Sequence, residues 1–274
     1  MKPHRCHAGI RSLDPARYMD AHVLFRNRST QRRELYGWLR RELLAHRADR
    51  RDVYAVLGVG SGTCVLDAAL VDDLQHIGPV RFVGVDPNTH ENETCRARMT
   101  SVVRGRSTAR VVDRTIEEFD AGGARFDAVT AVHAFYYSAE PDTALRQALA
   151  PLAQDGAVFL LSAPDNALSS LFVETSLELH GFAPCLSDRM ESALQRAGFR
   201  TRLEHIPAVV DVTPLCSPGD PEGELLLDFI VHADTRACTC GARERYRERV
   251  LELSSDVAGR AIVPHPVHGL VATR

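Results

Sequence analysis

The sequence predicts an α/β fold, a doubly wound and mostly parallel sheet with an N-terminal helical lid and a small C-terminal insertion. Three observations support this prediction. Short apolar runs alternate with helical patterns over the first ~160 residues. The first run ends in a glycine-rich turn and the second ends in an acid. The chain has 274 residues, of which 45% are hydrophobic, and this is enough to bury one full core.

Each strand is expected where a β-rich apolar run meets a turn residue, and each helix where apolar residues recur at helical spacing. Ser29 and Thr30 are natural N-caps for a helix that buries Leu35, Trp38, Leu39 and Leu43. The five strands of the first half are expected at Asp52–Gly58, Val80–Val85, Arg110–Val112, Phe126–Val132 and Ala157–Leu161. The helices between them are expected at Thr63–Leu74, Thr89–Val103 and Pro141–Leu152.

The second half continues with helical patterns and two long segments of strand character. Residues 1–50 are interpreted as lid helices, 51–165 as the ligand-binding core, and 166–274 as a substrate-covering insertion that also completes the sheet. Helices are expected at Leu168–Phe182, Ser187–Ala197, Glu224–His232 and Cys238–Ser254, and strands at Thr201–Val212 and Ala261–Val271.

Composition excludes several classes of partner. The net charge is -3 and the arginines are mixed with acids, so no nucleic-acid surface is expected. No segment approaches the ~18 apolar residues of a membrane span, so we expect a cytoplasmic protein. We further expect it to be a monomer or a weak homodimer. Seven cysteines are expected to be buried small hydrophobes rather than a disulfide framework. Cys238 and Cys240 lack a second pair at zinc-finger spacing, so no metal is expected.

The turn Gly58-Val59-Gly60-Ser61-Gly62 follows a strand and opens a helix, so its backbone can approach a ligand closely. Asp86 ends the next strand, where a carboxylate can accept both hydroxyl protons of a ribose. The spacing is G-x-G-x-G rather than the G-x-G-x-x-G of dinucleotide folds, which favours a methyltransferase over an NAD(P) enzyme. Thr115 and Val132 follow or end strands and are candidates for flanking adenine, with ordinary packing as the alternative.

Further residues carry a resemblance to the histamine N-methyltransferase family. They are Tyr18, Phe25, Ser29-Thr30, the loop Gly58–Gly62, Asp86-Pro87, Tyr136-Tyr137 and Leu226-Leu227-Asp228-Phe229. The resemblance implies a Rossmann-like domain that uses S-adenosylmethionine and releases S-adenosylhomocysteine. It implies that Gly58, Gly60, Gly62, Asp86, Thr115 and Val132 contact this cofactor.

The sequence departs from this family at substrate-binding positions. Where the resemblance implies a Glu that receives the substrate ammonium, the chain has Gln31, and a neutral amide cannot replace that charge-assisted contact. An amide that contacts the substrate ring is replaced by His133, an aromatic residue by His22, and an asparagine by His265. The predicted substrate contacts are His22, Phe25, Gln31, His133, Tyr136, Tyr137 and His265.

These departures predict a neutral, nitrogen-containing aromatic substrate. The leading hypothesis is methylation at C3 of an indole in a tryptophan-derived molecule such as a cyclic dipeptide, as in the similar indole methyltransferases of bacterial secondary metabolism. A base is then required, and Tyr18, Asp20 and His180 are the candidates. Two alternatives stay open: N-methylation of an imidazole or small aromatic amine, and a binding module that holds the cofactor without catalysis.

Overall fold

The computed structural model describes residues 10–48 and 52–274, and these form two compact units that interleave along the chain. The larger, here the sheet unit, contains Leu35–Ala163, Cys185–Ile206 and Val267–Arg274. The smaller, here the cap unit, contains the chain up to Glu34 together with Pro164–Pro184 and Pro207–Pro266. The segment Met1–Arg11 is polar and basic, so the sequence predicts that it is disordered or loosely attached, and most of it lies outside the described residues. Among those described, no helix combines the length and the apolar character needed to cross a bilayer.

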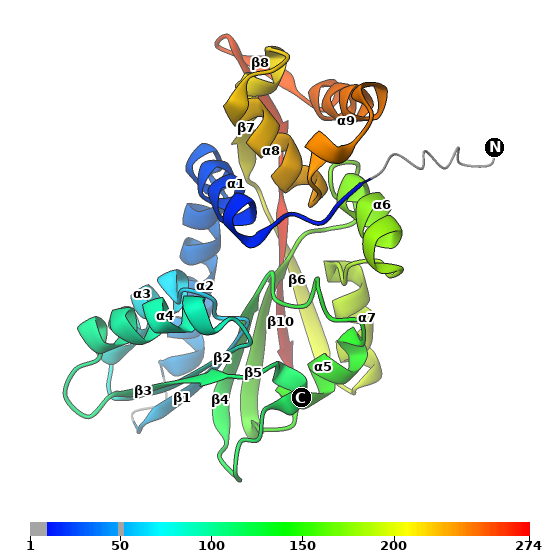
Figure 1. Cartoon of the computed structure of the whole chain (residues 1–274). Coiled ribbons are helices and arrows are strands. Elements are labelled where there is room, and N and C mark those ends of the chain that lie inside the picture. The colour runs from blue at the N-terminus through cyan, green and yellow to red at the C-terminus, as the bar shows by residue number, and fades with distance from the viewer. Residues whose placement is uncertain (1–9, 49–51) are drawn as a thin grey trace. The chain divides into compact units, whose positions relative to one another are not determined.

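The sheet unit is built on seven strands in the order β3-β2-β1-β4-β5-β10-β6 (Figure 1). Neighbours from β3 to β5 pair in parallel, whereas β10 is antiparallel to both β5 and β6. This confirms the predicted doubly wound, mostly parallel sheet. The strands are β1 Tyr54–Val59, β2 Val80–Asp86, β3 Thr108–Asp113, β4 Phe126–Val132, β5 Leu152–Ser162, β6 Arg200–Ile206 and β10 Val267–Thr273.

Helices cover both faces of this sheet, so its central strands, such as β1, are buried on two sides, whereas the outer strands β3 and β6 are largely exposed. Along β1 the side chains alternate between two cores: Tyr54 and Val56 pack in one, and Ala55 and Leu57 in the other. The first core includes α3 and α4, and the second includes α5 and α7, on the opposite face (Figure 1). The helices are α2 Gln31–Arg47, α3 Val65–Gln75, α4 Thr89–Val102, α5 Pro141–Leu149 and α7 Ser187–Arg196, and η1 is a short 3-10 helix at Ile116–Glu118.

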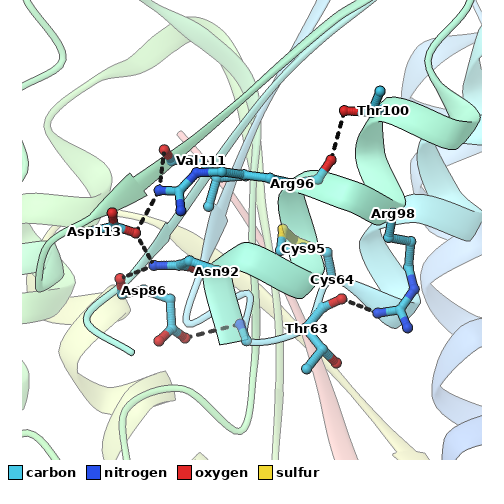
Figure 2. The surroundings of a disulfide bond; sticks show 11 residues. Thr63, Cys64, Asp86, Asn92, Cys95, Arg96, Arg98, Thr100, Val111 and Asp113 are labelled. Atoms are coloured by element: carbon cyan, nitrogen blue, oxygen red, sulfur yellow. Dashed lines mark hydrogen bonds and ion pairs between the residues drawn. A yellow bond between two sulfur atoms is a disulfide. The ribbon is translucent and has the colours of Figure 1, made fainter. Parts of the chain in front are cut away.

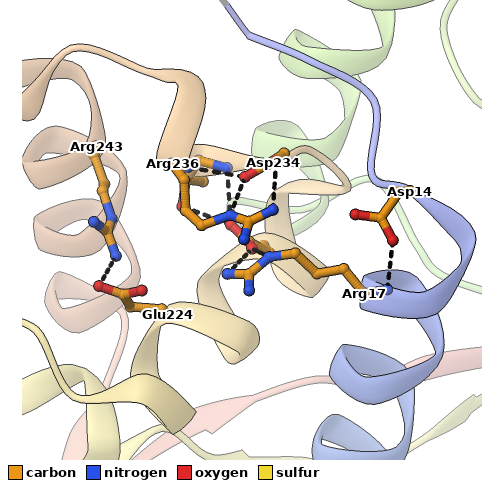
Figure 3. Close-up of polar contacts among 8 residues, drawn as sticks. Asp14, Arg17, Glu224, Asp234, Arg236 and Arg243 are labelled. Carbon is orange, nitrogen blue, oxygen red and sulfur yellow. Dashed lines mark hydrogen bonds and ion pairs between the residues drawn. The ribbon is translucent and has the colours of Figure 1, made fainter.

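The cap unit packs helices against a small antiparallel sheet of order β7-β9-β8. Its core contains Phe25 from the first helix, Leu226 from α8 and Val263 from β9. Arg17 donates from Nε to the fully buried carboxylate of Asp228 at 2.5 Å, beside the pair formed by Asp234 and Arg236 (Figure 3). Its elements are α1 Pro15–Arg28, α6 Ser169–His180, α8 Pro221–Val231, α9 Cys240–Glu252, β7 Val209–Asp211, β8 Ser255–Val257 and β9 Arg260–Pro264.

Two strand predictions in the second half were too long. The predicted strand Thr201–Val212 is divided into β6 and β7, and Ala261–Val271 is divided into β9 and β10. Pro207 lies in the first break and Pro266 in the second. Proline has no amide hydrogen to donate to a sheet ladder, so each long run ends one sheet and begins another.

The prediction that the cysteines are unlinked was wrong for one pair. Cys64 and Cys95 form a disulfide, with Cα atoms 4.8 Å apart (Figure 2). Cys64 directly precedes α3 and Cys95 lies in α4, and neither is exposed. The pairing depends on how two helices pack against each other, which cysteine spacing alone does not reveal.

Replacing Cys95 with Ala is expected to lower the free energy of unfolding by about 3 kcal/mol, because the link constrains a long loop in the unfolded chain. The two cysteines are 31 residues apart in sequence. Denaturant unfolding without reductant measures the difference. Cys216→Ser, at an exposed free cysteine, is the matched control and should unfold like the wild type. A wild-type midpoint that does not change when a reductant is added would contradict the prediction.

Candidate cofactor and substrate sites

The glycine turn after β1 takes backbone conformations that suit glycine. Gly60 has φ +63° and Gly62 has φ +49°. The Gly60 amide donates to the Val85 carbonyl at 2.8 Å, which ties the turn to the end of β2. A Cβ built on Gly60 would lie 2.6 Å from Cβ of Ala134, so the turn also contacts the segment after β4. The turn therefore lies at the carboxyl ends of β1, β2 and β4, where parallel sheets bind ligands.

Asp86 is held at this edge by three hydrogen bonds. Its Oδ2 accepts from the Gly62 amide at 3.0 Å, and its Oδ1 accepts from the Asn88 amide at 2.8 Å. The Asn92 side-chain amide donates to its carbonyl at 2.8 Å (Figure 2). The side chain is half-buried, and each carboxylate oxygen can accept more than one hydrogen bond. Asp86 is thus oriented by the turn itself.

Two further carboxyl groups near this turn were missed from the sequence. Loss of hydration raises the pKa of Asp67 to about 7, and the charge of Asp86 adds to the effect. Burial and the same charge also raise the pKa of Glu91, and a Cβ on Gly62 would lie 2.8 Å from its Oε2. Both acids stand in the first turn of a helix that follows a strand, a signal visible in the sequence. Three acids together make this edge electronegative.

The remaining predicted cofactor residues lie at the same edge of the sheet or beside it. Gly58 lies in β1, where a Cβ would be 2.6 Å from the Ser61 Oγ, so its lack of a side chain makes room for the turn. Val132 is the last residue of β4 and Thr115 caps η1 after β3, and both are half-buried. No ligand contact tests these two residues, and their role beside adenine stays a prediction.

His133 directly follows β4 in a left-handed conformation, with φ +53°. Its Nδ1 lies 2.6 Å from the hydroxyl oxygen of Tyr136, which is buried and 7% exposed. Tyr137 is 52% exposed, and its ring meets that of Tyr136 edge to face. The structure therefore brings three predicted substrate residues together beside the glycine turn.

The other predicted substrate residues gather in the cap unit as a group of ring contacts, here the ring cluster. His22 stacks on Phe229 with centroids 5.4 Å apart, and Phe25 contacts Phe229 at 4.6 Å. His265 meets Phe25 edge to face at 5.1 Å. The ring cluster consists of Tyr18, His22, Phe25, Phe172, Phe229, His232 and His265.

Sequence reasoning missed His232 and Phe172 in this cluster. His232 ends α8 with φ +51°, and its ring stacks on Phe172 with centroids 3.9 Å apart. Its position three residues after Phe229, on the same side of a helix, was the available signal. The left-handed conformation of His232 has no distinctive sequence pattern, so only this spacing could have indicated its place in the cluster.

The histidines of the ring cluster are neutral at physiological pH. Loss of hydration lowers the pKa of His265 to about 4 and that of His232 to about 3. It also lowers the pKa of His22, and the nearby charges of Arg26 and Arg32 add to this. Gln31 approaches His265 with 2.7 Å between Nε2 and Nδ1. The cluster therefore offers apolar rings and neutral hydrogen-bonding groups.

The three candidate bases lie in different surroundings. Tyr18 joins the ring cluster, with its centroid 5.9 Å from that of His22. Asp20 is exposed on α1, and His180 is exposed at the end of α6 beside Phe182. The structure thus places Tyr18 with the substrate candidates and leaves Asp20 and His180 outside the cluster. Within the described part of the chain, no three His, Cys, Asp or Glu side chains are grouped to hold a metal ion.

Comparisons with known proteins find proteins of similar sequence and similar fold. Residues 56–156 match the family described as methyltransferase domain. Histamine N-methyltransferase of Danio rerio is 24% identical over 282 residues, covering 94% of this chain and 96% of the relative. The YcgJ protein of Bacillus subtilis has a similar fold, with TM-score 0.58, 15% identity, and coverage of 88% of this chain and 98% of that one.

A second solved structure is the plantazolicin methyltransferase BpumL in complex with SAH. It matches with TM-score 0.54 and 12% identity, covering 95% of this chain and 91% of that chain. At these identities the solved structures establish the fold. The curated relative and the match to a methyltransferase domain confirm the predicted resemblance.

Acidification is expected to destabilise the protein through His232 and His265. Both have pKa values well below 6.5 when folded, so the unfolded chain binds protons that the folded chain does not. Their stabilising contribution is present above pH 6.5 and is lost as the pH falls toward 4, by up to about 1.4 kcal/mol per pH unit for each histidine.

Denaturant unfolding at pH 7, 6 and 5 measures this loss. His265→Asn removes one of the two titrating groups and should show a shallower decline with falling pH than the wild type. Equal slopes for the variant and the wild type would contradict the assignment.

Proposed function

We propose that this protein transfers a methyl group from S-adenosylmethionine to a neutral, nitrogen-containing aromatic small molecule. The observation that carries the proposal is the electronegative glycine turn. Asp67, Asp86 and Glu91 surround it. A sulfonium nucleoside is positively charged at sulfur and at its amino group, so these acids favour it. The pyrophosphate of a dinucleotide would be repelled by the same acids.

The residues at the sheet edge fit this cofactor. Asp86 would accept the ribose hydroxyl protons, and the glycine turn would admit the ligand close to the backbone. Thr115 and Val132 would flank the adenine ring. When bound, the cofactor supplies an electrophilic methyl group on sulfur, and the protein accelerates transfer mainly by holding the methyl acceptor in line with the carbon–sulfur bond.

The ring cluster supports a neutral aromatic acceptor. Its histidines are uncharged at pH 7, and Gln31 stands where a carboxylate would be needed to pair with an ammonium group. The specific acceptor that we propose is indole C3 in a tryptophan-derived molecule such as a cyclic dipeptide. The sulfur–methyl bond breaks and a carbon–carbon bond forms at C3. An amide nitrogen of the dipeptide ring then bonds to C2 of the indole and loses its proton, and S-adenosylhomocysteine is released.

A base would assist the loss of that proton. Tyr18 has the best support because it belongs to the ring cluster. Asp20 and His180 are weaker candidates for this base, since both are exposed. The second candidate function is N-methylation of an imidazole or aromatic amine, and the name of the Danio rerio relative favours it. A module that binds the cofactor without catalysis is the third.

Asp86→Ala is expected to weaken the binding of S-adenosylmethionine by about 30-fold or more, because charge-assisted hydrogen bonds to the ribose hydroxyls are lost. Isothermal titration calorimetry measures the dissociation constant. Asp120→Ala is a matched control, since Asp120 is exposed and bonds only locally to the Gly122 amide. Unchanged affinity in the Asp86 variant would remove the nucleoside assignment.

Purified protein is expected to methylate a tryptophan-containing cyclic dipeptide in preference to histamine in a panel with isotopically labelled cofactor. Release of S-adenosylhomocysteine measures turnover, and NMR of the product locates the methyl group. A methyl on a quaternary carbon supports C3 transfer, whereas an N-methyl signal favours the second candidate. If calorimetry detects cofactor binding but no acceptor is methylated, only the third candidate, a module that binds the cofactor without catalysis, is supported.

A further inference from the structure

We propose that the disulfide between Cys64 and Cys95 holds the backbone that completes the cofactor turn, so that reducing this bond weakens cofactor binding. The proposal rests on the proposed function for the assignment of the turn to S-adenosylmethionine. The disulfide, the glycine turn and Asp86 all belong to the sheet unit. The two cysteines act on the cofactor site by position and take no part in methyl transfer.

Cys64 is the residue at which the glycine turn passes into α3. Its φ is +55°, in the same left-handed region as Gly60 and Gly62. Its amide donates to the Ser61 carbonyl at 2.8 Å, so its conformation also sets the course of the turn. A residue with a β-carbon rarely takes this conformation and keeps it only where the surroundings enforce it, whereas glycine takes it readily. Cys64 therefore needs a restraint that a glycine at this position would not need.

The bond to α4 supplies that restraint. Cys64 and Cys95 are both fully buried, and their Cα atoms are 4.8 Å apart (Figure 2). Arg98, one turn beyond Cys95 in α4, donates to the carbonyl of Thr63, the residue before the linked cysteine of the turn. A side chain bonded to a helix can point in few directions, and this limits the φ and ψ of Cys64 itself. The disulfide thus fixes the last residue of the turn against α4.

The same helix also holds Asp86. Asn92, one turn before Cys95, is fully buried, and its side-chain amide donates to the Asp86 carbonyl at 2.8 Å. Asp86 Oδ2 in turn accepts from the Gly62 amide at 3.0 Å. The glycine turn, α4 and the end of β2 are therefore joined in a closed ring of contacts (Figure 2). Breaking the disulfide opens this ring next to the carboxylate that we assign to the ribose.

Reduction of the bond is a two-electron step that is linked to cofactor binding. A dithiol such as dithiothreitol gives two electrons and two protons to the sulfurs of Cys64 and Cys95, and itself closes to a cyclic disulfide. The factor by which reduction weakens cofactor binding must equal the factor by which bound cofactor disfavours reduction. Bound cofactor is therefore expected to protect the disulfide.

Isothermal titration calorimetry with S-adenosylhomocysteine tests the effect on binding. Oxidised wild-type protein is compared with protein reduced by dithiothreitol, after circular dichroism has shown that both are folded. The dissociation constant is expected to rise about tenfold on reduction, because the left-handed conformation of Cys64 is no longer enforced. Equal affinity before and after reduction would overturn the proposal. No binding by the oxidised protein would instead overturn the proposed function, and this inference with it.

The linkage gives a second measurement on the same protein. A tenfold effect on binding predicts that saturating S-adenosylhomocysteine lowers the reduction potential of the disulfide by about 30 mV. The protein is equilibrated in mixtures of reduced and oxidised dithiothreitol, and alkylation followed by mass spectrometry reports the fraction of Cys95 that is reduced. A potential that is the same with and without the ligand would contradict the proposal.

Two variants separate the conformation of the turn from the loss of stability. Cys64→Ala and Cys64→Gly both lack the disulfide, but only glycine takes the left-handed conformation readily. Cys64→Gly is expected to bind S-adenosylhomocysteine within about threefold of the oxidised wild type, and Cys64→Ala about tenfold more weakly than the wild type. Leu194→Ala in α7 is the control, since it removes a fully buried side chain on the opposite face of the sheet and should leave the dissociation constant unchanged. Equal affinities in the two Cys64 variants would overturn the proposal.

Discussion

The hydrogen bond from the Gly62 amide to the Asp86 carboxylate joins the two strand ends on which the cofactor assignment depends. It requires β1 and β2 to be parallel neighbours in one register, with Gly58 paired to Gly84 and Val59 to Val85. That register comes from two cores packed on opposite faces of the same strands. The buried apolar surface thus determines where a polar group is presented, and the disulfide behind the turn joins the two helices that follow these strands.

Charge divides the two groups of candidate residues. Acids gather at the glycine turn, and burial raises the pKa values of two of them, Asp67 and Glu91, which favours their neutral forms and limits mutual repulsion. The ring cluster instead contains histidines that burial keeps neutral. A cationic cofactor and an uncharged acceptor are the pair of reactants that these surroundings favour. Gln31 belongs to this pattern, because its amide meets a neutral imidazole where a carboxylate would attract a proton.

Much of the sheet unit could be predicted from the sequence, because most of its parallel strands contain short apolar runs, and β1 leads into a glycine turn while β2 ends in an acid. Gly58–Gly62 and Asp86 were found in this way. The cap unit was harder to predict, since Pro207 and Pro266 divide apolar runs that look continuous. The role of His232 and the link from Cys64 to Cys95 depend on how helices pack together. Asp67 and Glu91 were visible as first-turn acids, but their perturbed pKa values come from burial that a sequence does not show.

The position of β10 in the sheet has a consequence for synthesis on the ribosome. β5 and β6 are joined only through β10, which follows both in the chain. Until translation has released β10, the inner edges of β5 and β6 carry unpaired amides and carbonyls beside apolar side chains. The nascent chain is therefore exposed to mispairing for as long as the intervening cap residues take to emerge, and its protection in that interval falls to chaperones or to transient contacts of its own.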